Sequence, residues 1–241
     1  MTVTASAFDK WTDDDIRFYA GMGNRLGLAA PDLLLVLFAE SALDPAMPSY
    51  AKKDDGTPMA VGINQITSTL NKALGLTEAQ RLDMLNWSVS KQLPYVEKSL
   101  RLSAASRYDM PDAGGIYVAN FAPARLHLGF DGNVLLYDQK LHPKAYAANA
   151  PADTEKKGWI SLENLRQALR KNLGSSKFQA ALARYRSVTG DARAVRISPP
   201  PIGSTPIMDR PRAAGGGGGG DLGLAAAGVA AAVFFVWVSR R

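Results

Sequence analysis

A run of seven apolar residues, LLLVLFA at positions 33–39, is the clearest hydrophobic pattern in the first half of the chain. Pro31 and Asp32 precede it, and both residue types are favoured in the first turn of a helix. A helix that is apolar on every side has to be buried. The pattern therefore predicts a buried central helix, and Glu40, which follows the run directly, is expected at its partly desolvated end.

Helix starts elsewhere are marked by residues that cap helices. In a capping box, a Ser or Thr side chain and the side chain three residues later bond each other's backbone N–H groups. The predicted starts are Thr12 with Asp15, Thr77 with Gln80, Asn86, and Ser161. We expect the first of these helices to end near Tyr19 or Gly21 and the second near Leu85.

The helix after Asn86 carries an apolar stripe at helical spacing, which is expected to lie in the core. The stripe consists of Val89, Leu93, Val96 and Leu100. Pro123 limits a later helix around Tyr117. Together these patterns predict a mainly α domain over residues 1–144, followed by a smaller helical extension over residues 145–186.

The remainder of the chain has a different composition. Residues 187–221 contain three consecutive prolines and six consecutive glycines, which is typical of a flexible linker. Residues 222–238 are 17 uncharged, mostly apolar positions, followed by Arg240 and Arg241. A membrane span needs ~17 to 25 such residues, and a glycine-rich tether leaves this segment no sequence neighbour to pack against. We therefore expect one C-terminal transmembrane helix.

The composition predicts a folded domain, because 241 residues with 46% hydrophobic content can bury a sizeable core. The chain has no cysteine, which excludes disulfides and thiolate metal sites. Residues 1–150 carry 14 basic and 16 acidic side chains, whereas residues 151–241 carry 14 and 6. The basic last part indicates either solvated helix faces or an anionic neighbour, such as lipid head groups, acidic wall polymers or packaged nucleic acid. No specific nucleic-acid binding is expected.

Several reaction classes are excluded by their motifs. The chain has no G-x-S-x-G elbow, no Walker loop and no HExxH, and His127 and His142 are its only histidines. A loop that starts at Asp153 resembles part of a calcium-binding loop, but Lys157 and Asn164 stand where two of its ligands belong. We interpret this loop as a structural turn, and we expect no metal and no cofactor.

Glu40 is the candidate for acid–base chemistry. Desolvation disfavours a charged carboxylate and raises its pKa towards neutrality, as a general acid working near pH 7 requires. The simpler alternative is a glutamate at the end of a helix that faces water.

The residues around Glu40 favour the chemical interpretation. Glu40 and Ser41 are followed by a polar, turn-rich loop, then by Gly62, Ile63, Asn64, Gln65 and Ile66, and later by the segment YVANFAP at positions 117–123. In this order the segments resemble the lysozyme-like lytic transglycosylase family, in particular its phage-encoded members, over about residues 26–125. The sequence departs from the family pattern in having Asn64 in place of the usual methionine. It also has Ala119, not a tyrosine, directly before Asn120.

The resemblance implies a lysozyme-like fold that cleaves the MurNAc–GlcNAc β-1,4 bonds of peptidoglycan and leaves 1,6-anhydro ends. Glu40 would act alone, first as acid and then as base, with the acetamido group of the substrate in place of a second carboxylate. By the same resemblance, Ser41 and Gln65 would hydrogen-bond the sugar. Gly62, Ile63 and Asn64 would line the subsites, and Tyr117 or Asn120 would orient Glu40.

Two other functions stay open. A true hydrolase on the same fold would need a second carboxylate, for which Asp44, Asp54 and Asp55 are the nearest candidates in sequence. A non-catalytic virion or membrane structural protein would keep the cleft only to bind glycan. The intact Glu40–Ser41 and Gly62–Gln65 segments argue against this last function, because binding alone does not require the acid.

Localisation is predicted from a conflict between two features. The first residues lack the basic and apolar stretches of a signal peptide, yet a wall-cutting domain has to face peptidoglycan. Delivery from outside removes the conflict. We therefore expect a phage virion protein that opens the host cell wall for genome delivery and enters the host envelope as a single-pass membrane protein. Other virion proteins are possible partners, and a prophage relic or an unusual export route is the alternative.

Overall fold

Helices form most of the part of the chain that the computed structural model describes, residues 7–103 and 108–198, which confirms the mainly α prediction. The α-helices are α1 (Asp13–Leu26), α2 (Ala30–Ser41), α3 (Asn71–Leu74), α4 (Glu78–Asp83), α5 (Val89–Leu102), α6 (Ala113–Phe121), α7 (Pro143–Asn149), α8 (Leu162–Leu173) and α9 (Ser176–Thr189). The 3-10 helices are η1 (Ala7–Lys10), η2 (Ser68–Leu70), η3 (Met84–Asn86), η5 (Pro123–Leu128) and η6 (Ala150–Ala152).

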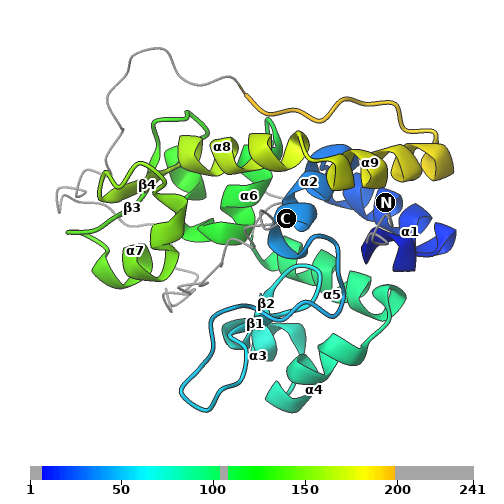
Figure 1. Ribbon diagram of the computed structural model, residues 1–241, viewed down its shortest axis with the longest axis horizontal. Helices are drawn as coiled ribbons and strands as arrows, with labels where there is room; N and C mark the ends of the chain where they lie inside the picture. The colour runs from blue at the N-terminus through cyan, green and yellow to red at the C-terminus, as the bar shows by residue number, and fades with distance from the viewer. Residues whose placement is uncertain (1–6, 104–107, 199–241) are drawn as a thin grey trace, which may run out of the picture.

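Four short strands form two separate antiparallel pairs. Strand β1 (Ala60–Val61) pairs with β2 (Ile66–Thr67), and β3 (Leu135–Asp138) pairs with β4 (Trp159–Ser161). The first pair lies beside α3 and α4, and this small unit has its own apolar cluster around Val61, Met84 and Trp87 (Figure 1). The turn between β1 and β2 contains residues 62–65.

Helix α2 is the centre of the fold, as its apolar run predicts. All of its residues are buried, and it contacts α1, α6, α8 and α9 (Figure 1). Burial of the six large apolar side chains at positions 33–38 contributes about 9 to 18 kcal/mol. That contribution is as large as the whole net stability of a typical domain. The position of α2 is therefore fixed firmly, including its polar C-terminal end.

Helices α8 and α9, from the predicted extension, share the main core with the first domain. Phe38 of α2 packs edge-on against Phe178 of α9, with ring centroids 5.3 Å apart. The described part of the predicted linker, residues 187–198, also lies against the domain. It completes α9 and then continues as an extended strap, whose Arg196 backbone N–H donates to buried Asp32 at 2.7 Å. The sequence predicted a flexible segment there.

The capping predictions were mostly correct. The structure confirms the capping boxes at Thr12 and Thr77 and the cap at Ser161. The cap predicted at Asn86 was wrong, because Asn86 lies in η3 and Ser88 caps α5. Serine can take this role because its hydroxyl accepts a hydrogen bond from the Lys91 backbone N–H.

Helix α1 is longer than predicted: it ends at Leu26, with Gly27 as its C-cap at φ 67°, instead of near Tyr19 or Gly21. Gly23 lies inside the helix, where an added Cβ would come 3.0 Å from the Cβ of Ala30. The glycine thus allows α1 and α2 to approach each other closely, and this benefit outweighs its low helix propensity.

The predicted membrane span at residues 222–238 lies outside the described residues. Within residues 7–103 and 108–198, no single helix has the length and apolar composition to cross a membrane. Helices α1 and α2 have that length and composition only when taken together, and they are bent by 112° relative to each other.

Candidate active site

The Glu40 carboxyl group lies in the last turn of α2 and is fully buried, at 0% exposure. The sequence predicted a partly desolvated position. Burial raises the pKa of Glu40 from 4.5 to about 8, against the opposing effect of hydrogen bonds from Asn120 and Tyr117. At pH 7 the carboxyl group is therefore mostly protonated. The apolar burial of α2 is large enough to hold such a group inside the protein.

Helix α6 supplies both groups that contact this carboxyl. Tyr117 and Asn120 are three residues apart and therefore lie on the same face of α6, which packs on α2. Asn120 Nδ2 donates to Glu40 Oε1 at 3.1 Å. The Tyr117 hydroxyl interacts with the same carboxyl, and its own pKa is raised well above 10 by burial and by the nearby Glu40 charge. Both are neutral donors at physiological pH.

The turn at residues 62–65 is built tightly against α5. Gly62 has a φ of 76°, and an added Cβ would come 2.5 Å from Gln92 Oε1. Only glycine meets both conditions without strain. Gln65 closes the turn, since its Nε2 donates to the Gly62 carbonyl at 3.0 Å and to the Met47 carbonyl at 3.1 Å.

Ser41 joins the end of α2 to this turn. Its Oγ donates to the Ile63 carbonyl at 2.8 Å and to the Leu37 carbonyl at 3.2 Å. Ser41 and Ile63 are both at 0% exposure. In this structure the Ser41 hydroxyl therefore holds the turn in place. Neither side chain is presented to solvent, whereas the sequence assigned both to sugar contacts.

Asn64 and Gln65 contribute polar atoms to the same region. They are 4% and 5% exposed. Asn64 Nδ2 donates to Asn120 Oδ1 at 3.0 Å, which connects the turn to the partner of Glu40. Asn64 Oδ1 and Gln65 Oε1 are buried and accept no hydrogen bond from the described residues. A buried acceptor without a donor is costly, so these two atoms are suited to receive hydroxyl groups of a ligand.

The structure thus brings all the residues predicted for the site into one region around Glu40, and it adds two that the sequence analysis missed. Gln92 is fully buried; its Oε1 accepts from the Ile63 N–H at 3.0 Å, and its Nε2 donates to the Pro45 carbonyl at 2.8 Å. Ser99 Oγ accepts from Asn64 at 2.9 Å. Both are polar residues on the buried apolar stripe of α5. A polar residue beside a predicted buried stripe is a feature of the sequence that could have identified them.

The three aspartates proposed as a second carboxylate lie just beyond α2 or in an exposed loop. Asp44 accepts from Lys10 Nζ at 3.3 Å and from the Ala46 N–H at 3.1 Å. Asp54 and Asp55 are exposed in the loop closed by the bridge between Lys52 and Pro58. Among the described residues, the groups that shift the pKa of Glu40 include no carboxylate.

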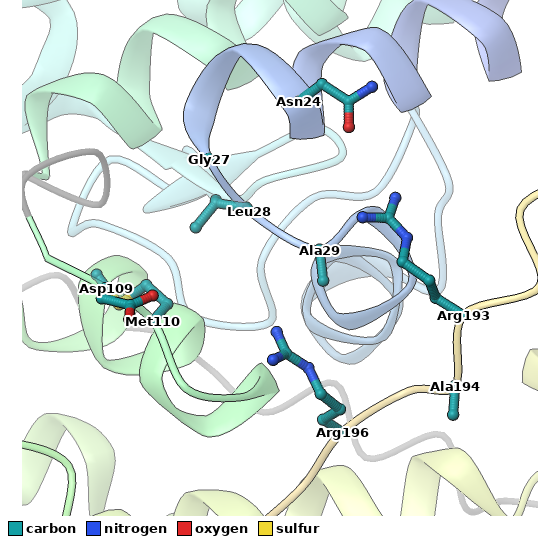
Figure 2. Close-up of a pocket in the computed structure, with 9 residues that line it drawn as sticks. All are labelled: Asn24, Gly27, Leu28, Ala29, Asp109, Met110, Arg193, Ala194 and Arg196. Carbon is teal, nitrogen blue, oxygen red and sulfur yellow. The ribbon is translucent and has the colours of Figure 1, made fainter.

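A separate pocket of about 630 Å³ lies where the strap passes the junction of α1 and α2 (Figure 2). Arg193 and Arg196 extend into it, but each pairs with an aspartate, Asp191 at 2.7 Å and Asp32 at 2.9 Å. Asp109 adds a further negative charge to the lining. Both arginines are paired, and the pocket contains none of the predicted site residues, so we do not assign it to the reaction.

The calcium-like loop is a turn that its own aspartate stabilises. Asp153 accepts hydrogen bonds from the backbone N–H groups of Lys157 at 3.0 Å and Gly158 at 2.7 Å. The described residues hold no group of three or more His, Cys, Asp or Glu side chains arranged for a metal ion.

Comparison with protein-family models, curated proteins and solved structures gives no match for the chain.

Proposed function

We propose that this protein is a peptidoglycan lytic transglycosylase in which Glu40 acts first as general acid and then as general base. The observation that carries the proposal is the fully buried Glu40 carboxyl, which accepts a hydrogen bond from the neutral Asn120 amide at 3.1 Å and whose pKa is raised to about 8 by burial. Such a group is protonated at neutral pH. Its pKa is close enough to the operating pH for the group to donate a proton and take it back.

The reaction balances with this single group. Protonated Glu40 gives its proton to the glycosidic oxygen as the bond from that oxygen to muramic acid C1 breaks. The substrate acetamido group stabilises the developing positive charge at C1. Ionised Glu40, held by Asn120 and Tyr117, then removes the proton from the muramic acid 6-hydroxyl, and O6 bonds to C1. The enzyme is returned to its starting state.

The turn at residues 62–65 supplies the proposed contacts to the glycan. Asn64 Oδ1 and Gln65 Oε1 of this turn are buried and accept no hydrogen bond from the described residues, and sugar hydroxyls would satisfy them. This supports the predicted sugar-binding roles of Asn64 and Gln65. In the proposal, Gly62, Ile63 and Ser41 shape and hold the turn.

The enclosed carboxyl requires an opening step before the glycan can reach it. Ala42 and Leu43, directly after the Glu40–Ser41 pair, both have positive φ, 53° and 64°. Two successive non-glycine residues in this conformation store strain of the order of 1 to 3 kcal/mol each. Leu43 is itself fully buried, and its carbonyl accepts from Trp11 Nε1 at 2.9 Å, so the core holds this strained segment in place.

The cleavage products distinguish the transglycosylase from the hydrolase. We expect digestion of purified peptidoglycan to give 1,6-anhydromuramic acid ends, because O6 of the substrate replaces water as the nucleophile. Mass analysis of the released sugars separates the two products, since hydrolysis adds one water. Reducing muramic acid ends as the main product would favour the hydrolase, and Asp44→Asn, Asp54→Asn or Asp55→Asn would then be expected to be inactive.

We also propose that residues 222–238 anchor the protein in a membrane and that it is a virion protein acting at the host envelope. At a helix centre each Leu, Phe or Val favours insertion by ~0.3 to 0.6 kcal/mol. A chain truncated after residue 221 is expected to leave the membrane fraction and to keep its activity in solution. Flotation with lipid vesicles measures this; full-length protein that stays soluble contradicts the anchor.

A further inference from the structure

Asn64 makes two hydrogen bonds with one amino group. Its Nδ2 donates to Ser99 Oγ on α5 at 2.9 Å and to Asn120 Oδ1 on α6 at 3.0 Å. Asn64 and Ser99 are each 4% exposed. The bond to Ser99 is buried and the bond to Asn120 is partly buried. A buried hydrogen bond is electrostatically stronger than the same bond in water.

The direction of these bonds is fixed at the Ser99 end. The Ser99 hydroxyl donates to the Val96 carbonyl at 2.8 Å, so towards Asn64 it can only accept. Asn64 must therefore present its amino group to both Ser99 and Asn120. A helix carbonyl of α5 thus sets the polarity of the whole chain of bonds.

The same polarity reaches Glu40. An asparagine amide has an oxygen end and a nitrogen end of nearly equal size, and only its partners decide which faces where. Because Asn64 donates to Asn120 Oδ1, the Asn120 amino group is left to face Glu40 Oε1, at 3.1 Å. An N–H donor at that position favours the ionised carboxylate over the protonated acid.

We propose that Asn64 is a positioning residue that acts on Glu40 through Asn120. It holds the Asn120 amino group towards the carboxyl group and so supports the ionised form of Glu40, which the second half of the reaction needs. The inference rests on the proposed function for its role in catalysis. The hydrogen-bond chain from Val96 to Glu40 does not depend on that function.

Among the described residues, few groups other than Asn120 influence the pKa of Glu40. Helices α1, α6, α8 and α9 pack on α2. Of the titratable side chains in the described residues, the one that faces the Glu40 carboxyl is Tyr117 on α6, and no charged group of α1, α8 or α9 contributes to its pKa. A change in the Asn120 amide should therefore be visible in the titration of Glu40.

Three substitutions in the full-length chain test the proposal by carboxyl ¹³C NMR titration of Glu40. Asn64→Leu removes the donor and is expected to raise the pKa of Glu40 by about half to one unit. Asn64→Asp is expected to raise it further, because an acceptor at position 64 turns the Asn120 oxygen towards Glu40 and adds a negative charge. Asn71→Leu is the matched control, since Asn71 Nδ2 donates to Glu78 at 2.7 Å outside this network. It should leave the pKa of Glu40 unchanged.

The pH profile of cleavage gives the second readout. Activity that requires protonated Glu40 falls at high pH, and this alkaline limb should move upwards in the order Asn64→Leu, then Asn64→Asp, by the same amounts as the NMR pKa. A changed KM alone would reflect the loss of a sugar contact. If Asn64→Leu does not fold, Ser99→Ala replaces it. This substitution removes the hydroxyl that fixes the direction of the hydrogen bonds, and it is expected to raise the pKa of Glu40 by a smaller amount.

An unchanged pKa of Glu40 in folded Asn64→Leu and Asn64→Asp overturns the proposal. The NMR titration needs no substrate, so it separates two failures. If the chain cleaves no glycan but shows the ordered pKa shifts, the role of Asn64 is supported and the proposed function is contradicted. If the chain cleaves glycan without those shifts, only the role of Asn64 is contradicted.

Discussion

Replacement of Glu40 by Gln is expected to reduce peptidoglycan cleavage by ~10²- to 10⁴-fold or more. The amide is nearly the same size as the carboxyl group and can still bond with Asn120, but it cannot donate a proton and take it back. Because Glu40 is enclosed by the most strongly buried helix of the fold, the substitution should leave that fold intact. Release of soluble fragments from purified peptidoglycan measures the loss, and circular dichroism checks the helices.

Two further measurements make this result specific. Asp44→Asn is the matched control, because it removes a carboxylate just beyond α2 that already bonds with Lys10 and the Ala46 N–H. It should retain activity. Binding of Glu40→Gln to insoluble peptidoglycan should persist, because the glycan contacts are proposed to lie in the turn at residues 62–65. Near-normal cleavage by Glu40→Gln would place the acid elsewhere and end the mechanism proposed for Glu40.

Glu40→Gln is also expected to stabilise the protein at alkaline pH by about 4 to 5 kcal/mol relative to its effect at pH 4, at 1.36 kcal/mol per pKa unit. The pKa of Glu40 is about 8 in the folded protein and 4.5 in the unfolded chain. Between these values the folded state binds the extra proton, so stability falls as the pH rises. Below pH 4.5 both states are protonated and the penalty is absent. Glutamine has no proton to lose and avoids the penalty throughout.

Denaturant unfolding of wild type and Glu40→Gln between pH 4 and 9 measures this difference, and for the control below the range is extended down to pH 2. Glu78→Gln is a control of opposite sign. The pKa of Glu78 is lowered to about 2, first by the Arg81 guanidinium, so the stability that Glu78 contributes is present above about pH 4.5 and is lost towards pH 2. If the difference in unfolding free energy between wild type and Glu40→Gln is the same at pH 4 and pH 9, Glu40 has an ordinary pKa. The buried, protonated state described for Glu40 is then contradicted. This experiment requires no substrate.

The features that the sequence determined by itself are local ones. The capping boxes at Thr12 and Thr77 bond groups only three residues apart, so the sequence alone specifies them. Burial of α2 follows from a run that leaves no polar face to solvent, and Glu40 is carried inside with it. The mainly helical class and the identity of the candidate acid therefore follow from the order of residues along the chain.

The tertiary structure decided what lies opposite each of these residues. Asn120 is 80 positions from Glu40 in the chain, and only the packing of α6 on α2 brings them together. Ser41 was assigned to the sugar by the family resemblance, yet its hydroxyl donates to the Ile63 carbonyl once the turn at residues 62–65 folds against α2. The polarity of the Asn64 amide depends in turn on a carbonyl of α5. Hydrogen-bond partners of buried side chains are set by which helices meet and at what register, and that is a property of the packed core as a whole.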